Sequence, residues 1–131
     1  MKLITRDTDY AVRALRFIAK NDKELTSVSE LVKELKIPKP FLRKILQVLS
    51  KKGLLKSYKG KGGGFKLSKR PAQILLVDLI TACQGSLKVS DHLFKSRLCP
   101  DTGKCKLKKK LDNIEKGLLS QLSDITLECL L

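Results

Sequence analysis

Two cysteines, Cys99 and Cys105, lie six positions apart in the turn-forming stretch CPDTGKC, and the lysine-rich run KLKKK follows them. Thiolates can bind iron or zinc, form a disulfide or act as a redox switch, and nearby lysines favour the thiolate form. Five residues between the thiols differ from the tight C-x2-C knuckle that is usual for structural zinc. The pair alone leaves a disulfide, a metal site, a redox switch and a structural accident open.

The rest of the chain indicates a cytoplasmic protein without a membrane-spanning segment. No apolar run approaches the roughly 18 residues of a membrane span, and MKLITRDTDY lacks the apolar core of a signal peptide. Cytosolic thiols are kept reduced, so the four cysteines favour metal or redox chemistry, or burial as small apolar residues, over a structural disulfide.

Positive charge is concentrated in the first half of the chain. A length of 131 residues suits one compact domain. The net charge of +15 suits a polyanionic partner. Residues 1–71 hold 19 Lys and Arg against 6 Asp and Glu, whereas residues 72–131 hold 9 against 7. No acidic residue occurs between Glu34 and Asp78, a stretch with 12 basic residues. This one-signed surface predicts binding to nucleic acid or to an anionic membrane surface.

Three helices precede a glycine-rich stretch. Apolar periodicity and capping residues predict helices over 6–20, 27–35 and 40–52, with a capping box at Ser27 and Glu30 and a stop at Gly53. The last two form a helix-turn-helix pattern. Residues 54–58 and 65–67 then predict two strands around glycines, which form the wing of a winged-helix domain. The glycines lack the GK[ST] signature of a P-loop, so nucleotide binding is not expected.

The second half predicts a buried helix over 73–83, a turn-rich segment over 84–105 and a long C-terminal helix. In that last helix Leu107, Leu111, Ile114, Leu118, Leu122, Ile125 and Cys129 recur at steps of three and four over about 25 residues. Such a stripe favours a homodimer, with packing inside one chain as the alternative. The overall prediction is a mainly α fold with a small β-hairpin, in which a winged helix-turn-helix (1–71) and a buried helix, cysteine loop and dimerisation helix (72–131) form one compact unit.

A winged helix places the second helix of the helix-turn-helix in the DNA major groove. The predicted contacts with double-stranded DNA are Lys39, Phe41, Arg43, Lys44 and Gln47 on that helix and Lys59, Lys61, Gly62 and Gly63 in the wing. The planar fork of Arg43 suits bidentate recognition of guanine, and the wing lysines suit phosphate or the minor groove.

A membrane surface is disfavoured because no single helix carries the basic residues. Basic RNA binding is the remote alternative because only six aromatic residues exist. With a single histidine and no paired acid-base motif, the chain is not expected to be an enzyme.

Four segments together resemble the IscR, NsrR and CymR family of bacterial winged-helix transcription regulators. They are TDYAVRAL (8–15), IPKPFLRKILQVLSKKGLL (37–55), KGKGGGFKL (59–67) and the cysteine loop followed by ITL (125–127). The resemblance covers essentially the whole chain. It implies a homodimer that binds a palindromic operator, with the long C-terminal helix making the dimer.

The resemblance also implies an iron-sulfur cluster, of the 2Fe-2S or 4Fe-4S type. Members of the IscR and NsrR type hold one with three cysteines spaced C-x5-C-x5-C, the last about twenty residues before ITL. Cys99 and Cys105 match two of these positions, but Leu93 occupies the third and cannot bind iron.

Several residues are candidates to replace the missing cysteine. Asp9, in TDY, matches the position where NsrR-like members supply a carboxylate from the partner subunit, and it is the first candidate. His92 and Cys83 are the others, although His92 also suits a solvated loop and Cys83 suits the core; Cys129 is predicted to pack with the leucine stripe. Some family members lack a cluster and respond through thiol oxidation or a protein partner, which is the alternative function for this chain.

Overall fold

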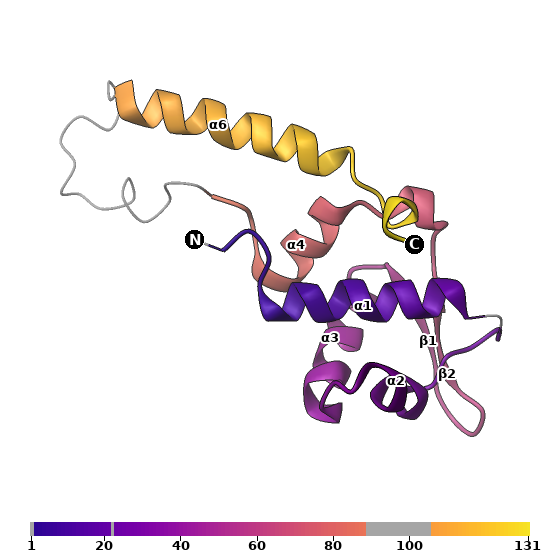
Figure 1. Ribbon diagram of the computed structural model, residues 1–131. Coiled ribbons are helices and arrows are strands. Elements are labelled where there is room, and N and C mark those ends of the chain that lie inside the picture. The colour runs from indigo at the N-terminus through magenta and orange to yellow at the C-terminus, as the bar shows by residue number, and fades with distance from the viewer. Residues whose placement is uncertain (1, 22, 89–105) are drawn as a thin grey trace.

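The computed structural model describes residues 2–21, 23–88 and 106–131. Helix α1 (Arg6–Lys20) begins at the N-cap Thr5, whose hydroxyl accepts a hydrogen bond from the Thr8 amide. A capping side chain satisfies one of the free amides at a helix start. One face of α1 is buried, and in Figure 1 the helix crosses the middle of the molecule. The predicted bounds of this helix agree with the structure.

The helix-turn-helix consists of α2 (Val28–Leu35) and α3 (Lys39–Lys51). Ser27 caps α2 by accepting from the Glu30 amide at 3.1 Å. After α3, the Gly53 amide donates to the Ser50 carbonyl and the Leu54 amide donates to the Leu49 carbonyl. These two bonds form a Schellman motif, which requires the left-handed backbone that Gly53 adopts at φ 80°.

The wing is an antiparallel hairpin of β1 (Leu55–Tyr58) and β2 (Gly64–Leu67), in which Ser57 lies opposite Phe65. Phe65 also exchanges two backbone hydrogen bonds with Thr26, at 2.8 and 2.9 Å, so the segment before α2 is attached to the wing. A Cβ atom on Gly64 would lie 2.6 Å from the Thr26 carbonyl oxygen. The wing can therefore approach the helix-turn-helix this closely only with glycine at position 64.

After the wing, the short 3-10 helix η1 (Pro71–Gln73) leads into α4 (Leu76–Gln84). The Leu76 amide donates to the Ile125 carbonyl at 2.9 Å, and the Leu127 amide donates to the Ile74 carbonyl at 2.8 Å. The side chain of Leu127 is 1% exposed and belongs to the main core. The ITL stretch thus attaches the end of the chain to the start of α4.

The last long helix, α6 (Lys106–Ser123), has 18 residues, so the predicted length of about 25 is wrong. The backbone leaves the helix after Ser123 because the following residues pair with the start of α4, and a 3-10 turn, η2 (Glu128–Leu130), ends the chain. Leu122 is buried, whereas Leu107 and Ile114 are 58% and 59% exposed. Figure 1 shows α6 on the far side of α1 from α2.

The main core joins α1, α2, α3, the hairpin, α4 and Leu127. A smaller cluster of Ile80, Leu87 and Leu122 packs α4 against α6. The mainly α winged-helix architecture with a C-terminal helix is confirmed. The division at residue 71 stays a prediction. Among the described helices, none is long and apolar enough to cross a bilayer.

Candidate nucleic-acid interface

The exposed face of α3 carries four of the predicted DNA contacts. Positions four residues apart on one side of the helix hold Lys39, Arg43 and Gln47. Lys44 directly follows Arg43 and lies at the edge of the same side. With Pro40 they line a shallow groove of about 490 Å³. This face holds three cations and one amide that can donate and accept hydrogen bonds.

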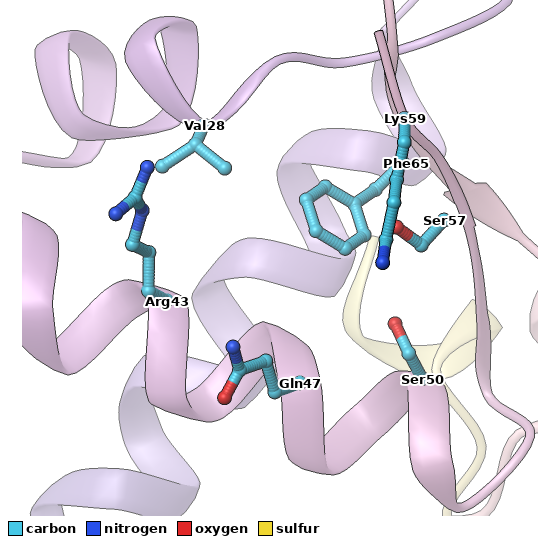
Figure 2. A pocket seen from close by; sticks show the side chains of 7 residues that line it. All are labelled: Val28, Arg43, Gln47, Ser50, Ser57, Lys59 and Phe65. Carbon is cyan, nitrogen blue, oxygen red and sulfur yellow. The ribbon is translucent and has the colours of Figure 1, made fainter.

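A second groove, of about 420 Å³, runs between α3 and the wing (Figure 2). Arg43 and Gln47 line it from α3, and Lys59 lines it from the end of β1. Figure 2 shows the Lys59 side chain extending from the hairpin toward α3. The structure therefore brings these three predicted residues together although up to 16 positions separate them in the sequence. Val28, Ser50, Ser57 and Phe65 complete the lining.

Ser50 contributes a buried polar atom to the α3–wing groove. Its hydroxyl oxygen is buried without a hydrogen-bond partner in the described part of the chain. A buried hydroxyl without a partner is costly. The Ser50 hydroxyl can donate to an anionic oxygen in the groove once its side chain rotates toward that oxygen.

The charge of this region is of one sign. Lys39 and Lys44 line the first groove, Lys59 lines the second and Arg43 lines both, and none of the described residues that line either groove is acidic. Surface charges of one sign add to a field that attracts a polyanion over several ångströms.

The tip of the wing carries three further predicted contacts, Lys61, Gly62 and Gly63. Lys61 is exposed between Gly60 and Gly62, whose φ angles are 98° and 80°. At Gly63 an added Cβ would clash with the Tyr58 carbonyl oxygen. The tip is therefore a narrow turn that presents a lysine with little side-chain bulk around it.

Phe41 lies apart from both grooves. The residue is 42% exposed, and the guanidinium carbon of Arg6, the first residue of α1, lies 5.0 Å from the centroid of the Phe41 ring. This distance is within the range of a cation–π contact. One face of Phe41, one of the five DNA contacts predicted on α3, is thus covered by a side chain from another helix.

Asp9, the predicted carboxylate ligand, lies in the first turn of α1. Its Oδ2 is 3.0 Å from the Nε of Arg13, one helical turn later, and the Asp9 side chain is 45% exposed. The carboxylate is therefore accessible to a partner subunit. An exposed ion pair of this kind is worth little, so freeing the Asp9 carboxylate from Arg13 costs little.

The predicted ligands Cys99 and Cys105, together with His92 and Leu93, lie outside the described residues. Within residues 2–21, 23–88 and 106–131, no three His, Cys, Asp or Glu side chains gather where they could hold a metal ion. Asp9 offers one accessible oxygen atom, whereas the thiolates that iron-sulfur clusters prefer lie outside the described residues, so the ligand set stays a prediction.

The other two cysteines differ in environment. Cys83 is half-buried against the main core, where burial raises the pKa of its thiol; the charge of Asp7 raises the pKa further, and a hydrogen bond with Thr8 opposes both. Cys129 is exposed, and hydrogen bonds with Thr126 lower the pKa of its thiol. The predicted packing of Cys129 in the leucine stripe is wrong because α6 ends before it.

The sequence patterns do not predict four of the residues that line the α3–wing groove. Ser57 and Phe65 enter the groove through the strand register, which alternates the faces of a hairpin. Ser50 shares the helix face of Gln47 at a step of three, which was a usable signal. Val28 reaches the groove only through the packing of α2, which no local pattern shows.

A family model described as an iron-dependent transcriptional regulator, Rrf2, matches residues 4–131. A protein of Aquifex aeolicus described as an HTH-type transcriptional regulator is 39% identical over 92 residues, which are 70% of this chain and 64% of that protein. The chain thus spans just under two thirds of the length of that relative.

Two solved structures are similar over nearly the whole chain. CymR, described as the global cysteine regulator of B. subtilis, has a TM-score of 0.79 and 23% identity, and the match covers 99% of this chain and 96% of that one. T. potens IscR has a TM-score of 0.75 and 26% identity, and the match covers 99% of this chain and 85% of that one. The family match over residues 4–131 shows that this chain belongs to the Rrf2 family of transcriptional regulators.

Proposed function

We propose that the chain binds double-stranded DNA through α3 and the wing and thereby regulates transcription. The observation that carries this proposal is the α3–wing groove, which unites Arg43, Gln47 and Lys59 beside the buried hydroxyl of Ser50. When a helix enters the major groove and a wing lies beside it, a phosphate strand passes between the two. The groove has the charge and the hydrogen-bond donors to bind that strand.

The contacts divide into base recognition and phosphate binding. Arg43 borders both grooves and its guanidinium matches the two acceptors of guanine, so we assign it to a base edge together with Gln47. Lys39, Lys44 and Lys59 are point charges that suit phosphates. At the wing tip Lys61, Gly62 and Gly63 suit the phosphate backbone or the minor groove, where small side chains permit close approach.

We propose that the chain acts as a homodimer on a palindromic operator. The exposed Leu107 and Ile114 lie two helical turns apart on α6, whereas the same stripe is buried at Leu122. A second α6 laid against this part of the helix would bury it. Two-fold symmetry of the protein then calls for two half-sites of opposite orientation.

We further propose that the cysteine segment controls DNA affinity. Cys99 and Cys105, with Asp9 of the partner subunit, would hold an iron-sulfur cluster of the 2Fe-2S or 4Fe-4S type, which supplies redox-dependent charge. The family description as an iron-dependent regulator and the exposed Asp9 carboxylate favour this reading. The alternative is a regulator without a cluster that responds to thiol oxidation or a protein partner; the similar fold of CymR, a cysteine regulator, keeps it open.

Binding to duplex DNA is tested with a fluorescent duplex and a single-stranded RNA of equal length, titrated by anisotropy. We expect tighter binding to the duplex, and loss of affinity in Arg43→Ala by about 1–3 kcal/mol per half-site. Arg13→Ala, which removes an exposed arginine from α1 outside both grooves, is the matched control. Tighter binding to the RNA would favour the RNA-binding alternative.

Cluster binding is tested by anaerobic purification and reconstitution, followed by visible absorption and by iron and sulfide analysis. We expect visible absorption bands and near-stoichiometric iron and sulfide, and their loss in a Cys99→Ala variant. A colourless, iron-free protein after reconstitution would leave the cluster-free alternative. In that case oxidant-dependent DNA binding that Cys105→Ser abolishes would identify the thiol switch.

A further inference from the structure

Arg6 is a cation where a helix disfavours one. It is the first residue of α1, and the N-terminus of a helix carries partial positive charge, so acidic residues are preferred there. Asp7 and Asp9 in the same turn follow that preference. Arg6 instead extends to α3, where its guanidinium carbon lies 5.0 Å from the centroid of the Phe41 ring. The negative face of the ring attracts the cation, whereas the N-terminus of its own helix repels it.

The side chain of Gln84 on α4 makes four hydrogen bonds to the segment that carries Arg6. Oε1 of Gln84 accepts from the Thr5 amide at 3.1 Å and from the Thr8 hydroxyl at 2.7 Å. Nε2 of Gln84 donates to the carbonyls of Lys2 and Leu3, both at 3.2 Å. A carboxamide has two acceptor sites and two donors, so all four are used on residues 2–8.

These contacts form a continuous connection across three helices. Gln84 is the last residue of α4, it fixes the residues on both sides of Arg6, and Arg6 contacts the third residue of α3. Phe41 is otherwise a large, partly exposed side chain on a helix whose neighbouring residues face the two grooves. The cation over its ring is thus a side-chain contact between the start of α1 and the first turn of α3.

We infer that Arg6 is a positioning residue for the DNA-reading helix and that Gln84 holds Arg6 in place. Arg6 stacks on Phe41 and thereby fixes the leading end of α3 relative to α1, without itself binding DNA. This inference rests on the proposed function of α3. It assigns a part in DNA recognition to two residues that lie outside the helix-turn-helix and the wing.

The stacking of Arg6 on Phe41 is tested without DNA. The chain has no tryptophan, so Phe41→Trp introduces one indole whose emission and acrylamide quenching report what covers position 41. We expect Arg6→Ala in this background to raise the quenching constant about twofold, Arg6→Lys to restore most of the difference, and Arg13→Ala to change nothing. Gln84→Met, which keeps the volume and removes the hydrogen bonds, should shift quenching in the direction of Arg6→Ala. Unchanged quenching in Arg6→Ala would overturn the inference.

The positioning role is tested by a double-mutant cycle on a selected DNA site. We expect Arg6→Ala to weaken binding threefold to tenfold with an unchanged salt dependence, and to cost nothing further in a Phe41→Leu background. Additive effects of the two substitutions, or a salt slope that decreases by about 0.9 per phosphate, would make Arg6 a direct phosphate ligand and contradict the inference. Thermal unfolding of each variant identifies effects that come from the fold. If the wild-type chain binds no DNA, the proposed function fails, while the tryptophan measurement still decides whether Arg6 covers Phe41.

Discussion

Replacing Lys59 with alanine should change the salt dependence of DNA binding by a predictable amount. Lys59 extends into the α3–wing groove, opposite Arg43 and Gln47, and we assign it to one phosphate. Each phosphate contact contributes a slope of about 0.9 to the fall of log affinity with log salt. A dimer therefore loses about 1.8 units of slope in Lys59→Ala. Over a rise from about 50 to 200 mM salt, the wild-type affinity should fall about tenfold more than that of the variant.

Anisotropy titrations of a labelled duplex at several salt concentrations measure both slopes directly. Lys116→Ala is the matched control because Lys116 is exposed on α6, outside the two grooves, and the same charge is removed. The control should keep the wild-type slope and lose little affinity. Equal slopes for Lys59→Ala and wild type would remove Lys59 from the phosphate contacts. An equal decrease in both variants would mean that only net charge matters, and the groove would have no special role.

Gly64→Ala should lower the free energy of unfolding by about 1–3 kcal/mol, because its Cβ meets a backbone carbonyl at 2.6 Å. Chemical denaturation measures this change. Gly117→Ala, whose Cβ meets nothing within 4 Å, is the control and should be neutral or stabilising. Iodoacetamide should modify the exposed Cys129 at lower pH than Cys83, because thiolate is the reactive form and their pKa values are shifted down and up, respectively; peptide mass spectrometry that finds Cys83 modified first would contradict this. Ile114→Lys should raise the dimer dissociation constant about a thousandfold, since about 2 kcal/mol of apolar burial is removed twice; sedimentation that shows the wild type as a monomer would refute the α6 dimer.

The first three helices were predictable because their boundaries are set by local chemistry. Thr5 and Ser27 accept hydrogen bonds from amides three residues later, and Gly53 adopts the left-handed backbone that ends α3. Each of these signals lies within a few residues of the boundary that it sets. Sequence pattern and structure agree there for that reason.

The end of α6 was not predictable because a distant segment determines it. Apolar residues continue at helical steps through Cys129, and no proline or glycine interrupts them after Ser123. The helix ends because the amide of Leu127 pairs with Ile74, more than 50 residues earlier. A periodic pattern carries no information on such a pairing.

The sequence predicts the charged residues of the candidate interface but not the packing that shapes the groove. Arg43, Gln47 and Lys59 were named from the helix-turn-helix and wing pattern, and they line one groove. The buried hydroxyl of Ser50 depends on how the hairpin packs on α3, and the stacking of Arg6 on Phe41 depends on how α1 crosses it. Both depend on tertiary packing between separate elements, which local patterns do not encode.

Selection of binding sites from a pool of random DNA duplexes tests the central claim most directly, because it needs no knowledge of the operator. The account predicts that the wild-type chain enriches a two-fold symmetric sequence, and that Arg43→Ala abolishes the preference at one position of each half-site while retaining salt-sensitive binding. Repeated selection that enriches no sequence, with equal affinity for all duplexes, would contradict the claim that α3 reads DNA.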